Sequence, residues 1–176
     1  MRYRRATPAD AQALASFGGR LFVESYRQWM DSAELVAYIS TNFTPDLQQA
    51  ELRAPDLITF LALDDNGDIA AYAQLAIGKL PDCELAARAP AELKRIYVDR
   101  RWHGQNVAPA LLRLVEQAAA EHGCDVLWLA VWEINERAIG FYEKNRFRVI
   151  GRQGFPIGNE IQTDHVMAKP LANELQ

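Results

Sequence analysis

The most constraining feature of the sequence is a strand-loop-helix pattern that occurs twice in succession. An apolar run over Glu92–Val98 precedes an amphipathic run over Pro109–His122, and the apolar run Val126–Trp132 precedes the helical pattern Asn135–Lys144. Alternation at this spacing predicts a right-handed crossover connection and two locally parallel strands. We therefore expect an α/β arrangement in which these two strands share a sheet.

Helices and a hairpin are expected in the first half of the chain. Tyr3–Ala6 has the pattern of a short strand, and a helix is predicted from Pro8 to about Met30. The pair Gly18-Gly19 predicts a break or a bend in that helix, because each glycine costs about 1 kcal/mol against alanine in a helix interior. The other elements expected here are helices beginning at Ser32 and at Thr44-Pro45, and strands at Leu57–Leu63 and Ile69–Gly78 around the Asn66-Gly67 turn.

Two more strands are predicted near the end of the chain. They cover Phe147–Arg152 and Gln162–Ala168 and flank a glycine-rich connection from Gly151 to Gly158. Lys79–Pro90 lacks clear periodicity and is expected to be a connecting segment. With 176 residues, 49% of them hydrophobic, the chain has the size of one domain, expected over residues 1–170 with a short tail at 171–176.

Charge and composition exclude several classes of protein. The net charge of -4 argues against a general nucleic-acid binder. No apolar run approaches the roughly 20 residues of a membrane-spanning helix, and Met1-Arg2-Tyr3-Arg4-Arg5 lacks the apolar stretch of a signal peptide, so we expect a cytoplasmic protein with no membrane partner. Cys83 and Cys124 are widely spaced and are not flanked like metal ligands or redox pairs, so we expect two reduced thiols and no metal.

A hexapeptide before the first of the two paired helices predicts an anion site. It reads His103-Gly104-Gln105-Asn106-Val107-Ala108. The first N–H groups of a helix have no partner within the helix, and together with the helix dipole they suit a pyrophosphate. Gly104 and Asn106 fit such a turn because both tolerate positive φ. Ordinary strand-to-helix turns have a similar composition, so the hexapeptide alone leaves both interpretations open.

The segments around the hexapeptide resemble those of a known superfamily. Glu92-Leu93, Ile96-Tyr97-Val98, the hexapeptide, Asn135-Glu136-Arg137-Ala138 and Phe141-Tyr142 follow the spacing of the GNAT superfamily of acyl-CoA N-acyltransferases. The resemblance implies an α+β fold with a mixed, mostly antiparallel, twisted sheet, a splayed central parallel strand pair and flanking helices. It also implies acetyl-CoA as the co-substrate.

The resemblance assigns cofactor contacts to both halves of this pattern. The family loop reads Gln/Arg-x-x-Gly-x-Gly/Ala; here His103 replaces the first residue and Asn106 replaces the first motif glycine. Asn135 is expected to bond the pantetheine arm of the cofactor, and its alternative role is a helix N-cap. The implied cofactor-binding residues are Ile96, Tyr97, Val98, His103, Gly104, Gln105, Asn106, Val107, Ala108, Asn135 and Arg137.

An acid and a base complete the implied site. A primary amine has a pKa near 10.4, so a base must accept its proton before it attacks a thioester. Glu92 is the first candidate base and Glu133 the second, while Tyr142 resembles the acid that protonates the departing thiolate. Strand-terminal Glu residues are often solvated or paired, and a lone Tyr at helical spacing is often a core aromatic, so these alternatives remain open.

A finer resemblance concerns the acceptor. Val126–Glu133, Gly158–Met167 and Ser25-Tyr26 with Trp29 are similar to bacterial polyamine-type acetyltransferases, the spermidine/spermine branch. A small polyamine is therefore the favoured acceptor, with an amino acid, a protein N-terminus or another amine as alternatives. Because His103 and Asn106 depart from the family loop, a non-catalytic coenzyme-A-binding module is the second alternative. The superfamily also allows a homodimer.

Other residues receive structural interpretations. Trp128 and Trp132 share a strand face and are expected in the core, although Trp132 could instead line the acceptor cleft. His165 is expected to be a satisfied structural histidine, and Cys124 a buried thiol. The acidic side chains expected near the cleft, where they would attract a cation, are Glu24, Asp31, Glu34 and Glu160.

Overall fold

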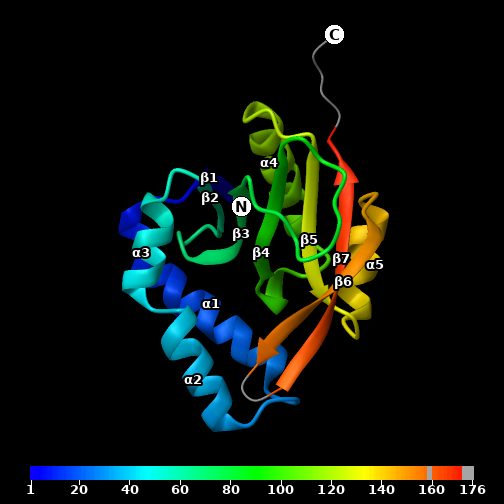
Figure 1. Ribbon diagram of the computed structural model, residues 1–176. Coiled ribbons are helices and arrows are strands. Elements are labelled where there is room, and N and C mark those ends of the chain that lie inside the picture. The colour runs from blue at the N-terminus through cyan, green and yellow to red at the C-terminus, as the bar shows by residue number, and fades with distance from the viewer. Residues whose placement is uncertain (158–159, 172–176) are drawn as a thin grey trace. The chain divides into compact units, whose positions relative to one another are not determined.

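The computed structural model describes residues 1–157 and 160–171 of the chain. Its strands form a seven-stranded sheet in the order β1-β2-β3-β4-β5-β7-β6 (Figure 1). The strands are β1 Arg2–Arg5, β2 Leu57–Leu63, β3 Ile69–Ile77, β4 Pro90–Val98, β5 Val126–Trp132, β6 Arg148–Ile157 and β7 Glu160–Pro170. The helices are α1 Ala11–Tyr26, α2 Ser32–Asn42, α3 Pro45–Arg53, α4 Val107–Glu121 and α5 Glu136–Lys144, with short 3-10 helices η1 Pro8–Asp10 and η2 Arg100–Trp102.

The sheet is mixed and mostly antiparallel, as predicted. Strand β4 pairs with β5 in parallel, whereas β1 with β2, β5 with β7, and β6 with β7 are antiparallel pairs. The residues cluster into two compact units: Met1–Gln74 with Arg95–Leu114, and Leu75–Lys94 with Val115–Gln176. Each unit has an apolar cluster of its own.

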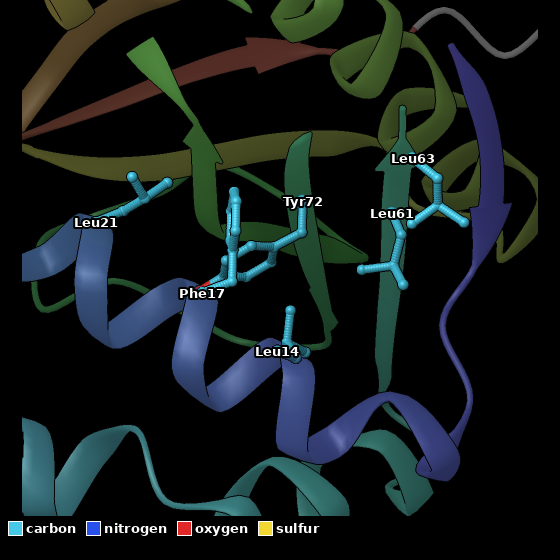
Figure 2. Close-up of a cluster of buried hydrophobic side chains, with 6 residues drawn as sticks. All are labelled: Leu14, Phe17, Leu21, Leu61, Leu63 and Tyr72. Atoms are coloured by element: carbon cyan, nitrogen blue, oxygen red, sulfur yellow. The ribbon is translucent and has the colours of Figure 1, made fainter. Parts of the chain in front are cut away.

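The apolar cluster of the first unit forms where α1 packs on the sheet. Leu14, Phe17 and Leu21 lie three and four residues apart, so they share one face of α1. Figure 2 shows these side chains directed toward Leu61 and Leu63 of β2 and Tyr72 of β3. All six residues are at most 6% exposed. Burial of each large apolar side chain stabilises the fold by about 1.5–3 kcal/mol, so this cluster holds α1 against the sheet.

Helix α1 runs without interruption from Ala11 to Tyr26, so the predicted break at Gly18-Gly19 is wrong. A Cβ atom on Gly18 would lie 2.7 Å from Phe43 Cε1 and 3.0 Å from the Tyr72 hydroxyl oxygen. The aromatic rings therefore occupy the space that a larger side chain would fill. Close packing outweighs the low helix propensity of glycine at this position.

A buried polar network supports the second half of β4. The Arg95 guanidinium donates to a Glu51 carboxylate oxygen at 2.7 Å and to Gln74 Oε1 at 3.2 Å. The Gln74 amide nitrogen in turn donates to Glu51 and to the Thr59 hydroxyl, each at 3.2 Å. Because an unpaired buried charge is costly, removing one partner would destabilise the others. The network joins α3, β2, β3 and β4 within the first unit.

The second unit is built around β5. All seven residues of β5 pair with β7, from Val126↔Pro170 to Trp132↔Asp164. The parallel register with β4 is much shorter and comprises Pro90↔Val126, Ala91↔Leu127 and Glu92↔Trp128. Beyond that last pair, strand β5 continues to Trp132 with β7 as its registered neighbour.

One face of this second unit is covered by the connecting segment that precedes β4. Trp128, Val166 and Ala168 form the buried centre, and Cys83 and Leu85 of the segment pack against them. The indole nitrogen of Trp128 donates to the Lys79 carbonyl at 2.8 Å, which satisfies its only polar atom. The expectation that Trp128 belongs to the core is confirmed.

Strand β6 is longer than the sequence predicts. It begins at Arg148 and extends to Ile157, so most of the expected glycine-rich connection is paired with β7. Gly151 lies at the register shift beside Val149, and a Cβ on Gly151 would lie 2.6 Å from the Cys83 sulfur. Position 151 therefore requires glycine because the Cys83 side chain approaches the strand closely there, and not because the segment is a loop.

Among the described helices, none combines the length and apolarity that a bilayer crossing requires.

The packing around Gly18 yields a matched test. Gly18→Ala should destabilise the protein by about 1–3 kcal/mol, because the new methyl group overpacks against Phe43 despite the gain in helix propensity. Gly140→Ala in α5 should instead stabilise it by up to about 1 kcal/mol, since a Cβ there meets nothing within 4 Å. Urea unfolding of the two variants measures the change in the free energy of unfolding. Equal changes of the same sign in both variants would contradict the packing account.

Candidate functional site

The predicted anion loop begins at a buried carboxylate, Asp99. The Asp99 backbone N–H donates to the Ala70 carbonyl of β3 at 3.0 Å, which holds the end of β4 against the sheet. Its side chain accepts from the Arg101 N–H at 3.0 Å and from the guanidinium groups of Arg101 and Arg20, at 3.1 and 2.9 Å. The Arg101 hydrogen bond chiefly holds the pKa of Asp99 well below its ordinary value, so this carboxylate stays ionised.

The side chain of His103 turns inward, toward the end of β4. Its Nε2 lies 2.9 Å from the Val98 carbonyl oxygen, so the ring donates a hydrogen bond there. The amide nitrogen of Gln105 donates to the Arg101 carbonyl at 2.8 Å. His103 and Gln105 therefore use side-chain donors to shape the loop, and the loop backbone is left to meet a ligand.

The backbone of the loop has the geometry that the hexapeptide predicts. Gly104 has φ of 76° and Asn106 has φ of 59°, both in the left-handed region. In the described chain, no turn or cap hydrogen bond engages the N–H groups of Gly104, Gln105 or Asn106. Helix α4 begins at Val107, and Ala110 donates to the Asn106 carbonyl, so the N–H groups of the first turn add further donors. The site fits a phosphate or pyrophosphate.

The three residues of β4 before this loop contribute differently. Tyr97 directs its ring into the core, where it stacks on Tyr72 at a centroid distance of 5.6 Å. Burial of the phenol raises the pKa of Tyr97 well above its ordinary value, so the phenol is neutral. Only the backbone of Tyr97 could contact a cofactor. Ile96 and Val98 flank it on the strand, and the Val98 carbonyl is already engaged by His103.

The second predicted half of the site lies in the other unit. Asn135 is the N-cap of α5, and its side-chain oxygen accepts from the Ala138 N–H at 3.2 Å. The N-cap role is the alternative that the sequence left open for Asn135. The NH₂ group of the same side chain can still donate a hydrogen bond to a ligand. Arg137, on the first turn of the same helix, is exposed.

Tyr142 is a buried residue on the inner side of α5. It is 7% exposed, and its ring meets the rings of Phe141 and Phe147 edge to face, with centroids 5.3 and 5.7 Å away. These contacts fix the orientation of the ring. Both a core aromatic and a positioned acid need a fixed ring, so the contacts do not distinguish the two roles. The role of Tyr142 therefore stays a prediction.

Glu92 lies where the parallel pairing ends. It is half-buried on β4 in register with Trp128 of β5, so both side chains share one face of the sheet. Glu133 follows the end of β5, and its N–H donates to the Thr163 carbonyl at 3.1 Å. Both candidate bases belong to the second unit, and neither role is tested by this geometry.

One carboxylate of this unit was missed by the sequence reasoning. Asp164 of β7 is 7% exposed and pairs with Trp132 across the sheet. Burial, followed by the nearby charge of Glu133, raises the pKa of Asp164 from 3.8 to about 6. Asp164 lies in the polar stretch Gln162–His165, which carries no motif, and only the strand register and the burial reveal its surroundings.

Several other expectations can be checked. His165 is not satisfied: its Nδ1 is buried and has no hydrogen-bond partner among the described residues. Both cysteines are free thiols, and burial raises the pKa of Cys124 as expected for an inert thiol. Within residues 1–157 and 160–171, no group of three or more His, Cys, Asp or Glu side chains could hold a metal ion. The side chain of Glu160 lies outside the described residues.

The perturbed carboxyl of Asp164 generates a pH prediction. The folded chain retains this proton where the unfolded chain releases it, so stability falls as pH rises from about 4 to about 6 and stays reduced above that range. The Asn side chain of Asp164→Asn cannot ionise, so this variant escapes the loss. The difference in free energy of unfolding between the variant and the wild type should therefore be about 1–3 kcal/mol more favourable to the variant at about pH 8 than at about pH 4. Chemical unfolding at both pH values measures this gain. Glu143→Gln, an exposed control, should show none, and a pH-independent Asp164→Asn difference would contradict the raised pKa.

Comparison with known proteins agrees with the geometry. The family model described as "Acetyltransferase (GNAT) family" matches residues 21–147, well over half of the chain. An uncharacterized N-acetyltransferase of Mycobacterium tuberculosis is 28% identical over 162 residues, which cover 92% of this chain and 98% of that protein. An uncharacterized N-acetyltransferase of Lactobacillus delbrueckii is 25% identical over 163 residues, 92% of each protein.

Solved structures show the same fold. The PaiA N-acetyltransferase of Thermoplasma acidophilum, solved in complex with coenzyme A, has a TM-score of 0.78 at 18% identity and covers 96% of this chain and 98% of its own. NAA60 of Arabidopsis thaliana, in complex with acetyl-CoA, has a TM-score of 0.70 at 14% identity, with 97% and 98% covered. The chain therefore belongs to the GNAT family of acetyltransferases.

Proposed function

We propose that the protein transfers an acetyl group from acetyl-CoA directly to a primary amine, with a small polyamine as the favoured acceptor. The observation that carries this proposal is the loop His103–Ala108. Its left-handed residues and free N–H groups form a ready-made anion site directly after β4. In the GNAT family such a loop, by resemblance, receives the pyrophosphate of coenzyme A.

The cofactor-binding roles divide between side chains and backbone. Gly104, Asn106 and the first turn of α4 would offer backbone N–H groups to the pyrophosphate. Asn106 keeps the turn that the family builds with glycine, because it adopts the left-handed conformation. This observation favours a loop that binds coenzyme A over one that has lost the capacity. The backbone of Ile96 and Val98 would hold the pantetheine arm, and the contact that the resemblance gives to Asn135 stays a prediction.

The chemistry requires a proton acceptor and a proton donor. Glu92, directly or through water, would take the proton of the acceptor ammonium and leave an amine lone pair free to attack the thioester carbonyl. As the new C–N bond forms and the C–S bond breaks, Tyr142 would protonate the departing thiolate, and the second proton released by the amine nitrogen would restore the Tyr142 hydroxyl. General acid and base catalysis each contribute about 10²–10⁴-fold in rate. No covalent enzyme intermediate is needed, in keeping with Cys124 being a buried thiol.

The charge of the second unit supports a cationic acceptor. Glu133 and Asp164 lie close enough for the charge of Glu133 to raise the pKa of Asp164. Two neighbouring carboxylates favour an ammonium group over a neutral or anionic one. The net charge of -4 also favours approach of a polycation at low ionic strength.

An amine panel with acetyl-CoA tests the proposed function. Spermidine and spermine should be acetylated more efficiently than amino acids or peptides with a free N-terminus, and release of free thiol reports each turnover. Inert polyamines beside a reactive amino acid or peptide would overturn the polyamine acceptor. Binding of acetyl-CoA without turnover on any amine would instead favour the non-catalytic module.

The role of Tyr142 is tested by removal of its hydroxyl. Tyr142→Phe should lower kcat about 10²-fold and leave the affinity for acetyl-CoA unchanged, because the ring packing is retained and only the proton donor is lost. Tyr3→Phe, on β1 of the first unit, is the matched control and should keep the wild-type rate. An unchanged kcat in Tyr142→Phe would return this residue to a purely structural role.

The inward hydrogen bond of His103 predicts that this side chain positions the loop. His103→Ala should weaken acetyl-CoA binding about 2–10-fold, the cost of one hydrogen bond, as measured by calorimetry. His122→Ala is the control, because His122 Nδ1 lies 2.8 Å from the Ala118 carbonyl at the far end of α4. Equal affinities for wild type and His103→Ala would show that the loop keeps its shape without this bond.

A further inference from the structure

The segment that joins β3 to β4 lies over one face of the second unit. This strap, Lys79–Ala89, has neither helical nor strand structure and passes in front of β5 and β7 in Figure 1. Cys83 and Leu85 pack on the buried centre of the face, whereas Leu80 is 65% exposed. The strap is therefore attached to the sheet by a few side chains and is not part of the strand pairing.

Single hydrogen bonds attach the first half of the strap. At its start, the Trp128 indole nitrogen donates to the Lys79 carbonyl at 2.8 Å. Three residues further on, the Asp82 N–H donates to the side-chain oxygen of Gln153 on β6 at 3.4 Å, which is long for a hydrogen bond. A segment with few buried contacts and weak hydrogen bonds opens at a lower free energy than the strands beneath it.

The strap covers a buried carboxylate. Asp164 of β7 is the cross-strand partner of Gln153, and such partners point to the same face of a sheet. The strap contacts this face at Gln153 and again at Gly151, two residues earlier on β6. Asp164 is 7% exposed, so the closed strap separates its carboxyl group from water.

No cation compensates Asp164 in the described part of the chain, where its carboxyl group accepts no hydrogen bond and belongs to no ion pair. The groups near it are neutral or acidic: Trp132 of β5, Glu133 after β5, Gln153 of β6, and the exposed Asp82 and Glu84 of the strap. The cations of the strap, Lys79 and Arg88, belong to its two ends. Burial, followed by the charge of Glu133, raises the pKa of Asp164 to about 6. The closed strap therefore favours the protonated carboxyl group.

We propose that the strap is a lid, which closes over the face of β5 and β7 while Asp164 is protonated and opens when Asp164 ionises. Opening brings the new charge into contact with water, and it breaks the strap contacts while the strand pairing stays intact. The closed form retains the proton, so the lid opens as pH rises. The inference goes beyond the proposed function and holds whichever amine the protein acetylates.

Hydrogen exchange of the Trp128 indole N–H measures the opening, because this proton meets water only when its bond to Lys79 breaks. Nuclear magnetic resonance of the full chain in deuterium oxide follows the exchange, and the spectrum of Trp128→Phe identifies the signal. Exchange itself accelerates with pH, so each wild-type rate is divided by the rate of Asp164→Asn at the same pH. The ratio should rise about 100-fold between about pH 4 and about pH 6 and then stay level, as a pKa of about 6 against 3.8 requires.

Two comparisons decide whether Asp164 and the strap are responsible. Glu84→Gln removes one negative charge from an exposed position of the strap itself and should keep the wild-type rates. Exchange should also be insensitive to low concentrations of urea, because opening of the strap exposes little surface, whereas unfolding of the sheet accelerates steeply with urea. A ratio that does not change with pH, or a rise that disappears in Glu84→Gln, overturns the lid. A steep dependence on urea also overturns it, because the sheet itself then unfolds.

Discussion

The buried carboxylate of Asp99 is the interaction on which the first unit's ligand loop depends. It is 4% exposed, yet it accepts from the backbone and guanidinium of Arg101 and from Arg20 of α1. Its own N–H ties β4 to β3. One residue thus joins a strand end, a neighbouring strand, a helix and the first turn of the loop. Because these hydrogen bonds converge on one buried carboxylate, the conformation of the loop is coupled to the stability of the first unit.

The second unit uses a buried carboxylate in the opposite way. Asp99 has its cations, and its pKa is lowered; Asp164 has another carboxylate as its neighbour, and its pKa is raised to about 6. The first arrangement stabilises the loop to which we assign the pyrophosphate in our proposal. The second reduces the stability of the folded chain at neutral pH, because the buried carboxyl resists ionisation. Functional sites commonly hold groups whose environment does not favour the isolated protein. This contrast fits an enzyme that binds an anionic co-substrate and a cationic acceptor.

Local patterns predicted much of the fold and of the candidate site. Strand β5 matches its predicted range, α5 begins after the Asn135 cap, and the hexapeptide adopts its left-handed turn because the responsible residues adjoin one another in the sequence. The failures depended on distant residues. The glycines of α1 accommodate Phe43, and β6 continues because β7 pairs with its glycine-rich run. Asp164 acquires its character from burial, which no local motif encodes.

The central claim is that the loop after β4 holds the pyrophosphate of coenzyme A. The most direct test compares acetyl-CoA with acetyl-pantetheine, which carries the same thioester and arm but no phosphate, by calorimetric titration of the wild-type protein. If the pyrophosphate accepts several charge-assisted hydrogen bonds from the loop, acetyl-CoA should bind at least about 100-fold more tightly than acetyl-pantetheine. Added salt should reduce this difference in affinity. Equal affinity for the two compounds would contradict the account.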